Sequence, residues 1–144
     1  MKSIDEVQQE IIDEFSVFDD WMDKYALIIE QGNALGKLDE KYKSPENIIQ
    51  GCQSRVWLNS ELRDGKLYFE ADSDAVIVKG LLALVLRVFS GRTPDEIIGT
   101  DLRFMKEIGL TEHLSPTRSN GLLSVIKQIR FYAMAYKAKS TDNK

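Results

Sequence analysis

The fold is decided by residues 55–72, which read RVWLNSELRDGKLYFEAD. Apolar and polar side chains alternate on both sides of Asp64-Gly65, which predicts a β-hairpin with a two-residue turn. A three-residue turn would set Leu62 against Lys66 and mix the two faces, so the shorter turn is favoured. It places three cross-strand pairs on one face: Leu62 with Leu67, Ser60 with Phe69, and Leu58 with Ala71.

Two helices are predicted before the hairpin. A Ser3-x-x-Glu6 capping box opens the first of them. An aspartate of the Asp19-Asp20 pair caps the second, and Gly32 and Gly36 end it. Residues 37–50 are charged and irregular, and they lead into the hairpin.

A helix from Ala75 to Ser90 follows the hairpin, with apolar residues on nearly every side. It is therefore expected to be the central buried helix, with residues 72–74 as its cap and Gly80 at a close crossing with another element. A capping box at Thr93-Pro94-Asp95-Glu96 opens a short helix, and another is expected from about Asp101 to Ile108.

The last helix opens at Ser115-Pro116 and carries a core stripe of Leu122, Ile126, Ile129, Ala133 and Tyr136. The expected fold class is α+β: a small antiparallel sheet of about three strands packed against a layer of helices. Residues 1–144 are expected to form one domain, with a frayed polar tail from Lys139.

Composition narrows the class of function. The net charge of −4 argues against nucleic-acid binding. The longest apolar run, residues 75–89, is too short to span a bilayer, and the acidic N-terminus has no signal-peptide pattern. A cytoplasmic location is therefore expected, where a free thiol stays reduced.

Charge is distributed unevenly along the chain. Residues 1–30 carry nine acids and two bases, whereas residues 103–144 carry eight bases and three acids. Two solvated helix faces would explain this distribution. The alternative is a protein contact that is steered by electrostatics.

Cys52 is the only cysteine, which excludes an intramolecular disulfide, a CxxC redox pair and a four-thiolate metal site. Its neighbours, Gly51 on one side and Gln53-Ser54-Arg55 on the other, are small or polar, as in a loop tip. Gly51 allows close approach, and Arg55 would favour the reactive thiolate. The alternative is a structural role, because cysteine is often simply a small buried hydrophobe.

Other chemistry has little support. His113 is the only histidine, and it lies in a predicted loop before the last helix. A Cys-His hydrolase would need His113 beside Cys52, and a structural or solvated role is the simpler interpretation. One cysteine and one histidine without clustered spacing give no metal site. Asp72 and Asp74 look like helix caps.

Five segments of the chain form a recognisable set of motifs. The most specific is residues 49–57, IQGCQSRVW; supporting segments are residues 44–47 (SPEN), 72–75 (DSDA), 77–81 (IVKGL) and 113–122 (HLSPTRSNGL). Together they resemble the SufE family of sulfur-acceptor proteins, which includes CsdE. The resemblance covers nearly the whole chain in the family's order. It implies a fold similar to that of the IscU scaffold, although a single cysteine makes scaffold activity doubtful on chemical grounds.

The resemblance also implies a function. Cys52 would accept sulfur as a persulfide from a cysteine desulfurase of the SufS or CsdA type and pass it to a SufB-containing scaffold complex. The chain would then be an accessory sulfurtransferase without a cofactor, because the PLP belongs to the desulfurase. Gly51, Gln53 and Arg55 would support the loop, while His113 and Arg118 match the C-terminal motif without an assigned step. The sequence leaves open whether the chain forms a homodimer. It also leaves open an alternative function, that of a non-catalytic interaction module or scaffold-like regulator in which Cys52 is structural.

Overall fold

The computed structural model describes residues 2–50, 52 and 54–142, with side chains as far as Lys139. The chain begins with α1 (Ile4–Ser16), α2 (Trp21–Leu35) and two short 3-10 helices, η1 (Glu40–Tyr42) and η2 (Pro45–Asn47). The strands β1 (Val56–Arg63) and β2 (Lys66–Ser73) follow. The remaining helices are α3 (Val76–Phe89), α4 (Pro94–Gly99), α5 (Phe104–Glu107), α6 (Leu110–His113) and α7 (Pro116–Asp142).

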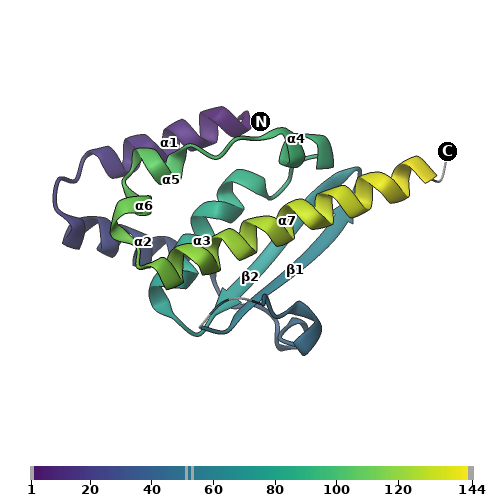
Figure 1. Cartoon of the computed structure of the whole chain (residues 1–144), viewed down its shortest axis with the longest axis horizontal. Helices are drawn as coiled ribbons and strands as arrows, with labels where there is room; N and C mark the ends of the chain where they lie inside the picture. Colours follow the sequence, from purple (N-terminus) through teal and green to yellow (C-terminus); the bar gives the residue numbers. More distant parts are fainter. Residues whose placement is uncertain (1, 51, 53, 143–144) are drawn as a thin grey trace.

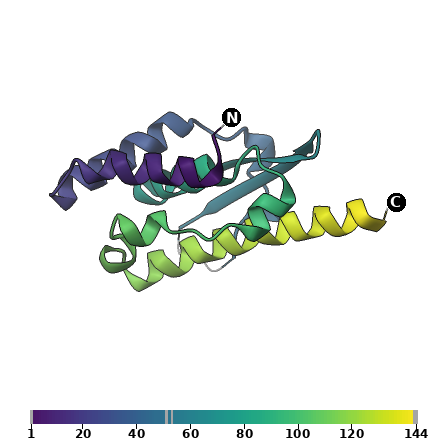
Figure 2. The same cartoon turned by 90° about the horizontal axis from the view of Figure 1, so that it is seen from above.

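The elements are arranged in layers, as the α+β prediction requires (Figure 1). Figure 2 shows α1 and α2 on one side of the molecule and the long α7 on the other, with the hairpin between them. None of the described helices is both long enough and apolar enough to cross a bilayer.

The hairpin has the predicted register. Asp64 and Gly65 adopt positive φ angles of 52° and 79°, which form the tight turn. The pairs Leu62–Leu67, Ser60–Phe69 and Leu58–Ala71 face each other. Among the described residues the sheet has two strands, not about three. The flanking segments add only single bridges, Ile48 to Trp57 and Leu67 to Arg92, because neither continues as an extended strand.

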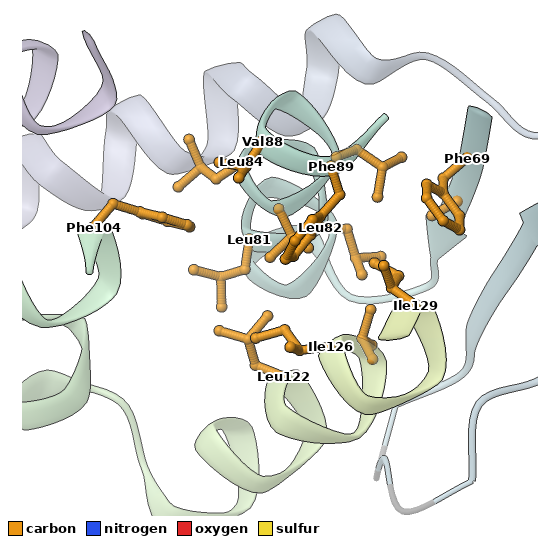
Figure 3. Packing of buried hydrophobic residues seen from close by; sticks show 14 of the residues in the cluster. Phe69, Leu81, Leu82, Leu84, Val88, Phe89, Phe104, Leu122, Ile126 and Ile129 are labelled. Carbon is orange, nitrogen blue, oxygen red and sulfur yellow. The ribbon is translucent and has the colours of Figure 1, made fainter. Parts of the chain in front are cut away.

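Helix α3 forms the centre of the core, as predicted. Its residues from Gly80 to Leu86, together with Val88 and Phe89, are buried. Figure 3 shows Leu81 and Leu82 of α3 close to Leu122 and Ile126 of α7. The predicted stripe of α7 is confirmed: Leu122, Ile126, Ile129 and Ala133 are buried, and Tyr136 packs against the cluster.

Helices α2 and α3 cross at two glycines. A Cβ atom on Gly80 would lie 2.1 Å from the carbonyl oxygen of Ile28, and one on Gly32 would lie 2.8 Å from the backbone nitrogen of Gly80. The close crossing predicted at Gly80 is thus confirmed. The prediction that Gly32 helps to end α2 is wrong, because the helix continues to Leu35 and ends at Gly36, whose φ is 79°.

The capping predictions succeed at three helices and fail at one. Ser3, Asp20 and Thr93 cap their helices through side-chain oxygens. The aspartates of residues 72–74 do not cap α3, whose N-cap is Ala75 without a side-chain bond. Instead Asp74 accepts a hydrogen bond from the backbone of Arg55.

Asp72 is a buried anchor, with only 4% of its surface exposed. Its carboxylate accepts a hydrogen bond from the Leu38 N–H at 3.2 Å and forms ion pairs with Lys43 at 3.4 Å and Lys79 at 3.2 Å. Burial disfavours its charge, but the N–H groups of Leu38 and Ser73 and the Lys79 ammonium outweigh that effect and lower its pKa. Asp72 thereby ties the irregular segment before the hairpin to α3.

The C-terminal part differs from prediction in its boundaries. The helix expected from Asp101 to Ile108 is reduced to α5, and His113 is the last residue of α6 rather than part of a loop. Helix α7 continues to Asp142, past Lys139, where the polar tail was expected to begin.

Candidate functional site

Cys52 lies in a short loop whose two ends are held together. Before the cysteine, the Ile49 N–H donates to the carbonyl of Val56 at 2.9 Å, and Ile48 forms a bridge with Trp57. The chain therefore leaves and re-enters the edge of β1 at nearly the same place. This geometry presents Cys52 at the entrance of the hairpin, as the sequence predicted.

The C-terminal end of the loop is anchored to the end of β2 through the backbone of Arg55. The Arg55 N–H donates to the carboxylate of Asp74 at 3.1 Å, and its carbonyl accepts from the Ser73 hydroxyl at 2.8 Å. The Asp74 N–H also donates to the Arg55 carbonyl, at 3.3 Å. Arg55 thus supports the loop through its main chain, while the residue as a whole is exposed.

The thiol of Cys52 is half-buried and contacts the first turns of α7. Its Sγ donates to the carbonyl of Gly121 at 3.5 Å. A Cβ atom on Gly121 would lie 3.4 Å from the same sulfur, so a larger side chain there would meet the thiol. Glycine at this helical position leaves the space that Cys52 occupies.

A cavity of about 340 Å³ opens beside the sulfur, between the loop, α3 and α7. Its apolar side is lined by Val56, Val78, Leu81, Leu82, Leu122 and Val125, and its polar side by Ser54, Ser115, Thr117 and Arg118. Arg118 is the one charged side chain among the described residues that line it. Ser115 positions this end of α7, because its hydroxyl accepts from the Arg118 N–H at 3.3 Å.

Burial raises the pKa of the Cys52 thiol above its ordinary value, because the charged thiolate is less well solvated in this position. No charge among the described residues contributes to this shift. The expectation that Arg55 would favour the thiolate is therefore wrong, and the resting thiol is held in its protonated form.

We expect Cys52 to be alkylated slowly by iodoacetamide in the folded protein at neutral pH, because the thiolate is the reacting species. As the pH rises through the raised pKa, the rate should increase, with a midpoint higher than that of the same chain in urea. Intact mass measured over time across a pH series checks this. A folded midpoint at or below the unfolded one would contradict the effect of burial.

The structure separates the other predicted site residues. Arg118 reaches the cavity of Cys52, whereas His113 stacks on Trp21 at 3.9 Å between ring centroids and does not line that cavity. A hydrolase pairing of Cys52 with His113 therefore has no geometric support. Gly51 and Gln53 lie outside the described residues, so the structure does not test their expected roles.

Sequence reasoning missed Gly121, Ser115 and Thr117 as neighbours of the cysteine. Two signals were available: all three residues lie in the 113–122 segment that resembles the SufE family, and a glycine stands beside the apolar stripe of α7, where alanine would favour the helix by about 1 kcal/mol. Within the described residues, no group of three or more His, Cys, Asp or Glu side chains is placed to hold a metal ion.

Comparison with known proteins places the chain in a family. The SufE profile, described as an Fe-S metabolism associated domain, matches residues 9–133. The chain belongs to the SufE family. It is 45% identical over 135 residues to an uncharacterised SufE-like protein of Rhizobium etli, covering 90% of this chain and 88% of that protein. An uncharacterised SufE-like protein of Rhizobium meliloti is 44% identical over 135 residues, covering 90% of this chain and 94% of that protein.

A solved structure supports the fold independently. The solution structure of a hypothetical protein from Thermus thermophilus is similar to this SufE chain with a TM-score of 0.71, covering 90% of this chain and 94% of that one. The two sequences are only 16% identical, so the likeness concerns the fold alone. The family assignment associates this SufE protein with iron–sulfur metabolism.

Proposed function

We propose that this SufE protein is a sulfur carrier that takes sulfane sulfur from a PLP-dependent cysteine desulfurase onto Cys52. The observation that carries the proposal is the single thiol, which lines a cavity and lies on a loop anchored at both ends. The chemistry needs one thiol, because a second one nearby would release the sulfur by forming a disulfide.

The transfer is a thiol exchange without net oxidation. The Cys52 thiolate attacks the terminal sulfur of the desulfurase persulfide, and a new S–S bond forms on Cys52. The S–S bond of the desulfurase persulfide breaks, and its cysteine leaves as a thiolate that takes up a proton. Because burial keeps the resting thiol protonated, Cys52 must lose its proton when the desulfurase docks.

The cavity suits the product of this step. It has room beside Sγ for one more sulfur atom, and its apolar side limits contact with water and with other thiols. Arg118 at its polar side offers a positive charge to a persulfide anion.

The resulting role is that of an accessory protein for cluster assembly in the cytoplasm. It would stimulate a desulfurase of the SufS or CsdA type by removing sulfur, and then pass that sulfur to a SufB-containing scaffold complex. The chain itself would need no cofactor, because the PLP stays with the desulfurase.

The test is to incubate the purified protein with a SufS-type desulfurase and cysteine and to weigh it intact. We expect a gain of one sulfur atom that a reductant removes, because a persulfide S–S bond is reducible. A matched incubation without cysteine should give no gain. If no cognate desulfurase produces the added mass, the carrier function is wrong.

A further inference from the structure

Several hydrogen-bond donors line the cavity beside Cys52 without an acceptor. The hydroxyls of Ser54 and Thr117 and the Thr117 N–H donate to no group among the described residues. The Ser115 oxygen accepts from the Arg118 N–H at 3.3 Å, so the proton of this hydroxyl is still available. These donors belong to one wall of the cavity, and a ligand rich in hydrogen-bond acceptors would satisfy them.

Arg118 adds a positive charge without a counterion to the same wall. Other arginines of the chain form ion pairs with carboxylates, namely Arg63, Arg87, Arg92 and Arg103. Arg118 forms no such pair with a described residue, and the described lining of the cavity includes no carboxylate. The charge of this lining therefore favours an anionic ligand.

The position of Arg118 in α7 strengthens this conclusion. Arg118 lies in the first turn of a helix of 27 residues, where the positive end of the helix dipole favours acidic side chains. A basic residue at this place is repelled by the dipole and costs the helix some stability. An anion in the cavity would be attracted by both positive charges and would offset this repulsion.

Size and reactivity narrow the class of anion. The cavity of about 340 Å³ is several times the ~30 Å³ that a water molecule occupies in the liquid, so it admits a small anion. The Cys52 sulfur lines the same cavity, and a thiol exchanges with S–S bonds. A ligand that suits the donors and the thiol together is an oxyanion that carries a sulfane sulfur. Inorganic thiosulfate is the simplest of this class.

We propose that the cavity binds thiosulfate and that Cys52 takes the outer sulfur of this anion without a desulfurase. The oxygens of thiosulfate would face Arg118 and the hydroxyls of Ser54, Ser115 and Thr117, and its outer sulfur would face Sγ of Cys52. The use of the resulting persulfide rests on the proposed carrier function, to which this reaction adds a second sulfur donor for the same thiol.

The transfer exchanges one S–S bond for another. Cys52 gives its proton to solvent, and its thiolate attacks the outer sulfur of thiosulfate. A new S–S bond forms on Cys52, while the S–S bond of thiosulfate breaks and its electron pair leaves with sulfite. A thiolate and thiosulfate thus become a persulfide anion and sulfite, so atoms and charge balance and no oxidant or reductant takes part. Arg118 and the hydroxyls would stabilise the charge of the departing sulfite.

The first test compares the folded protein with the same chain unfolded in urea. Each is incubated with excess thiosulfate and no desulfurase, and intact mass and released sulfite are followed over time. We expect the folded protein to gain one reductant-sensitive sulfur atom faster than the unfolded chain, because only the folded chain has the anion site. Iodoacetamide is neutral and should show the opposite order, since burial of Cys52 slows its reaction.

The second test removes the positive charge from the cavity. Arg118→Ala should lower the rate of loading by thiosulfate about tenfold or more, as for loss of a charge-assisted hydrogen bond. Arg118→Lys keeps the charge without the planar fork and should lose less. Lys127→Ala is the matched control: it removes an exposed charge from the same helix, outside the lining of the cavity, and should load at the wild-type rate.

Binding is measured apart from the chemistry with sulfite and the Cys52→Ser variant. This variant should bind sulfite without gaining mass, and adding Arg118→Ala should raise the Kd about tenfold or more in calorimetry. An Arg118 with a merely structural role would lower the Tm and leave this Kd unchanged. Because Arg118 is exposed, we expect the Tm to stay the same.

Two results would overturn the proposal. One is that folded protein takes sulfur from thiosulfate no faster than unfolded chain does. The other is that Arg118→Ala and Lys127→Ala load at the same rate. A parallel incubation with a SufS-type desulfurase and cysteine tests the carrier function separately. Loading by the desulfurase alone would exclude thiosulfate as a donor and leave the carrier function intact, whereas loading by thiosulfate alone would support the anion site and exclude the desulfurase.

Discussion

Cys52→Ser is expected to abolish sulfur acceptance and to reduce stimulation of the desulfurase to the rate of the desulfurase alone. A serine hydroxyl cannot replace the thiolate as the sulfur nucleophile, and the sequence contains no other cysteine. The measurement is alanine release by the desulfurase with and without each protein, together with intact mass of the acceptor. The expected loss is complete, because no second thiol can substitute.

The serine variant should keep its fold. The Cys52 sulfur donates to the Gly121 carbonyl at 3.5 Å, and the smaller serine hydroxyl fits the same space and can donate to that oxygen after a small shift. Thermal unfolding and the Kd for the desulfurase should therefore match the wild type. If Cys52→Ser stimulates the desulfurase as well as the wild type does, the protein is an interaction module and its cysteine is structural.

His113→Ala distinguishes a Cys-His hydrolase from the sulfur carrier and from the interaction module. His113 stacks on Trp21 and does not line the Cys52 cavity, so its loss should leave sulfur loading intact. A hydrolase would instead lose turnover of a small ester or amide in this variant.

The hairpin could be predicted to the residue because its determinants are local. Alternating side chains select the buried face, and the Asp64-Gly65 turn selects the register, so two independent signals agree. The capping boxes at Ser3 and Thr93 were predicted for the same reason, because each motif includes both of its partners.

Contacts between distant segments could not be predicted in this way. An aspartate before a helix has the same local pattern whether it caps the helix or meets Lys43 and Lys79, as Asp72 does. The sequence around Arg87 did not indicate its partners either, although its guanidinium donates hydrogen bonds to Glu10 and Glu14 of α1 and to Gln31 of α2. These partners become neighbours only when the helices pack.

The site was predictable in part. The small and polar neighbours of Cys52 indicated a loop, and the loop is there. The electrostatics expected from Arg55 were wrong, because adjacency in sequence does not outweigh burial of the thiol. The cavity depends on α7, which follows the cysteine by more than sixty residues, so only the family resemblance pointed to Arg118.

Gly80→Ala is expected to have the largest effect on stability. The new Cβ would lie 2.1 Å from the Ile28 carbonyl oxygen and 2.5 Å from its Cγ2, so α2 and α3 would have to move apart. Both helices belong to the core, and overpacking that displaces backbone costs about 3 kcal/mol or more. For a chain of this size we expect a fall in Tm of roughly 10 °C, measured by circular dichroism or calorimetry.

Gly99→Ala is the matched control. Gly99 also lies in a helix, at the end of α4, but nothing lies within 4 Å of its added Cβ, so its stability should change by less than about 1 kcal/mol. Gly32→Ala enters the same crossing as Gly80→Ala, because its Cβ would lie 2.8 Å from the Gly80 nitrogen. Once one methyl group has separated the helices, the second should cost less, so the double variant should lose less than the sum of the single losses. Equal Tm values for Gly80→Ala and Gly99→Ala would mean that the two helices do not cross this closely.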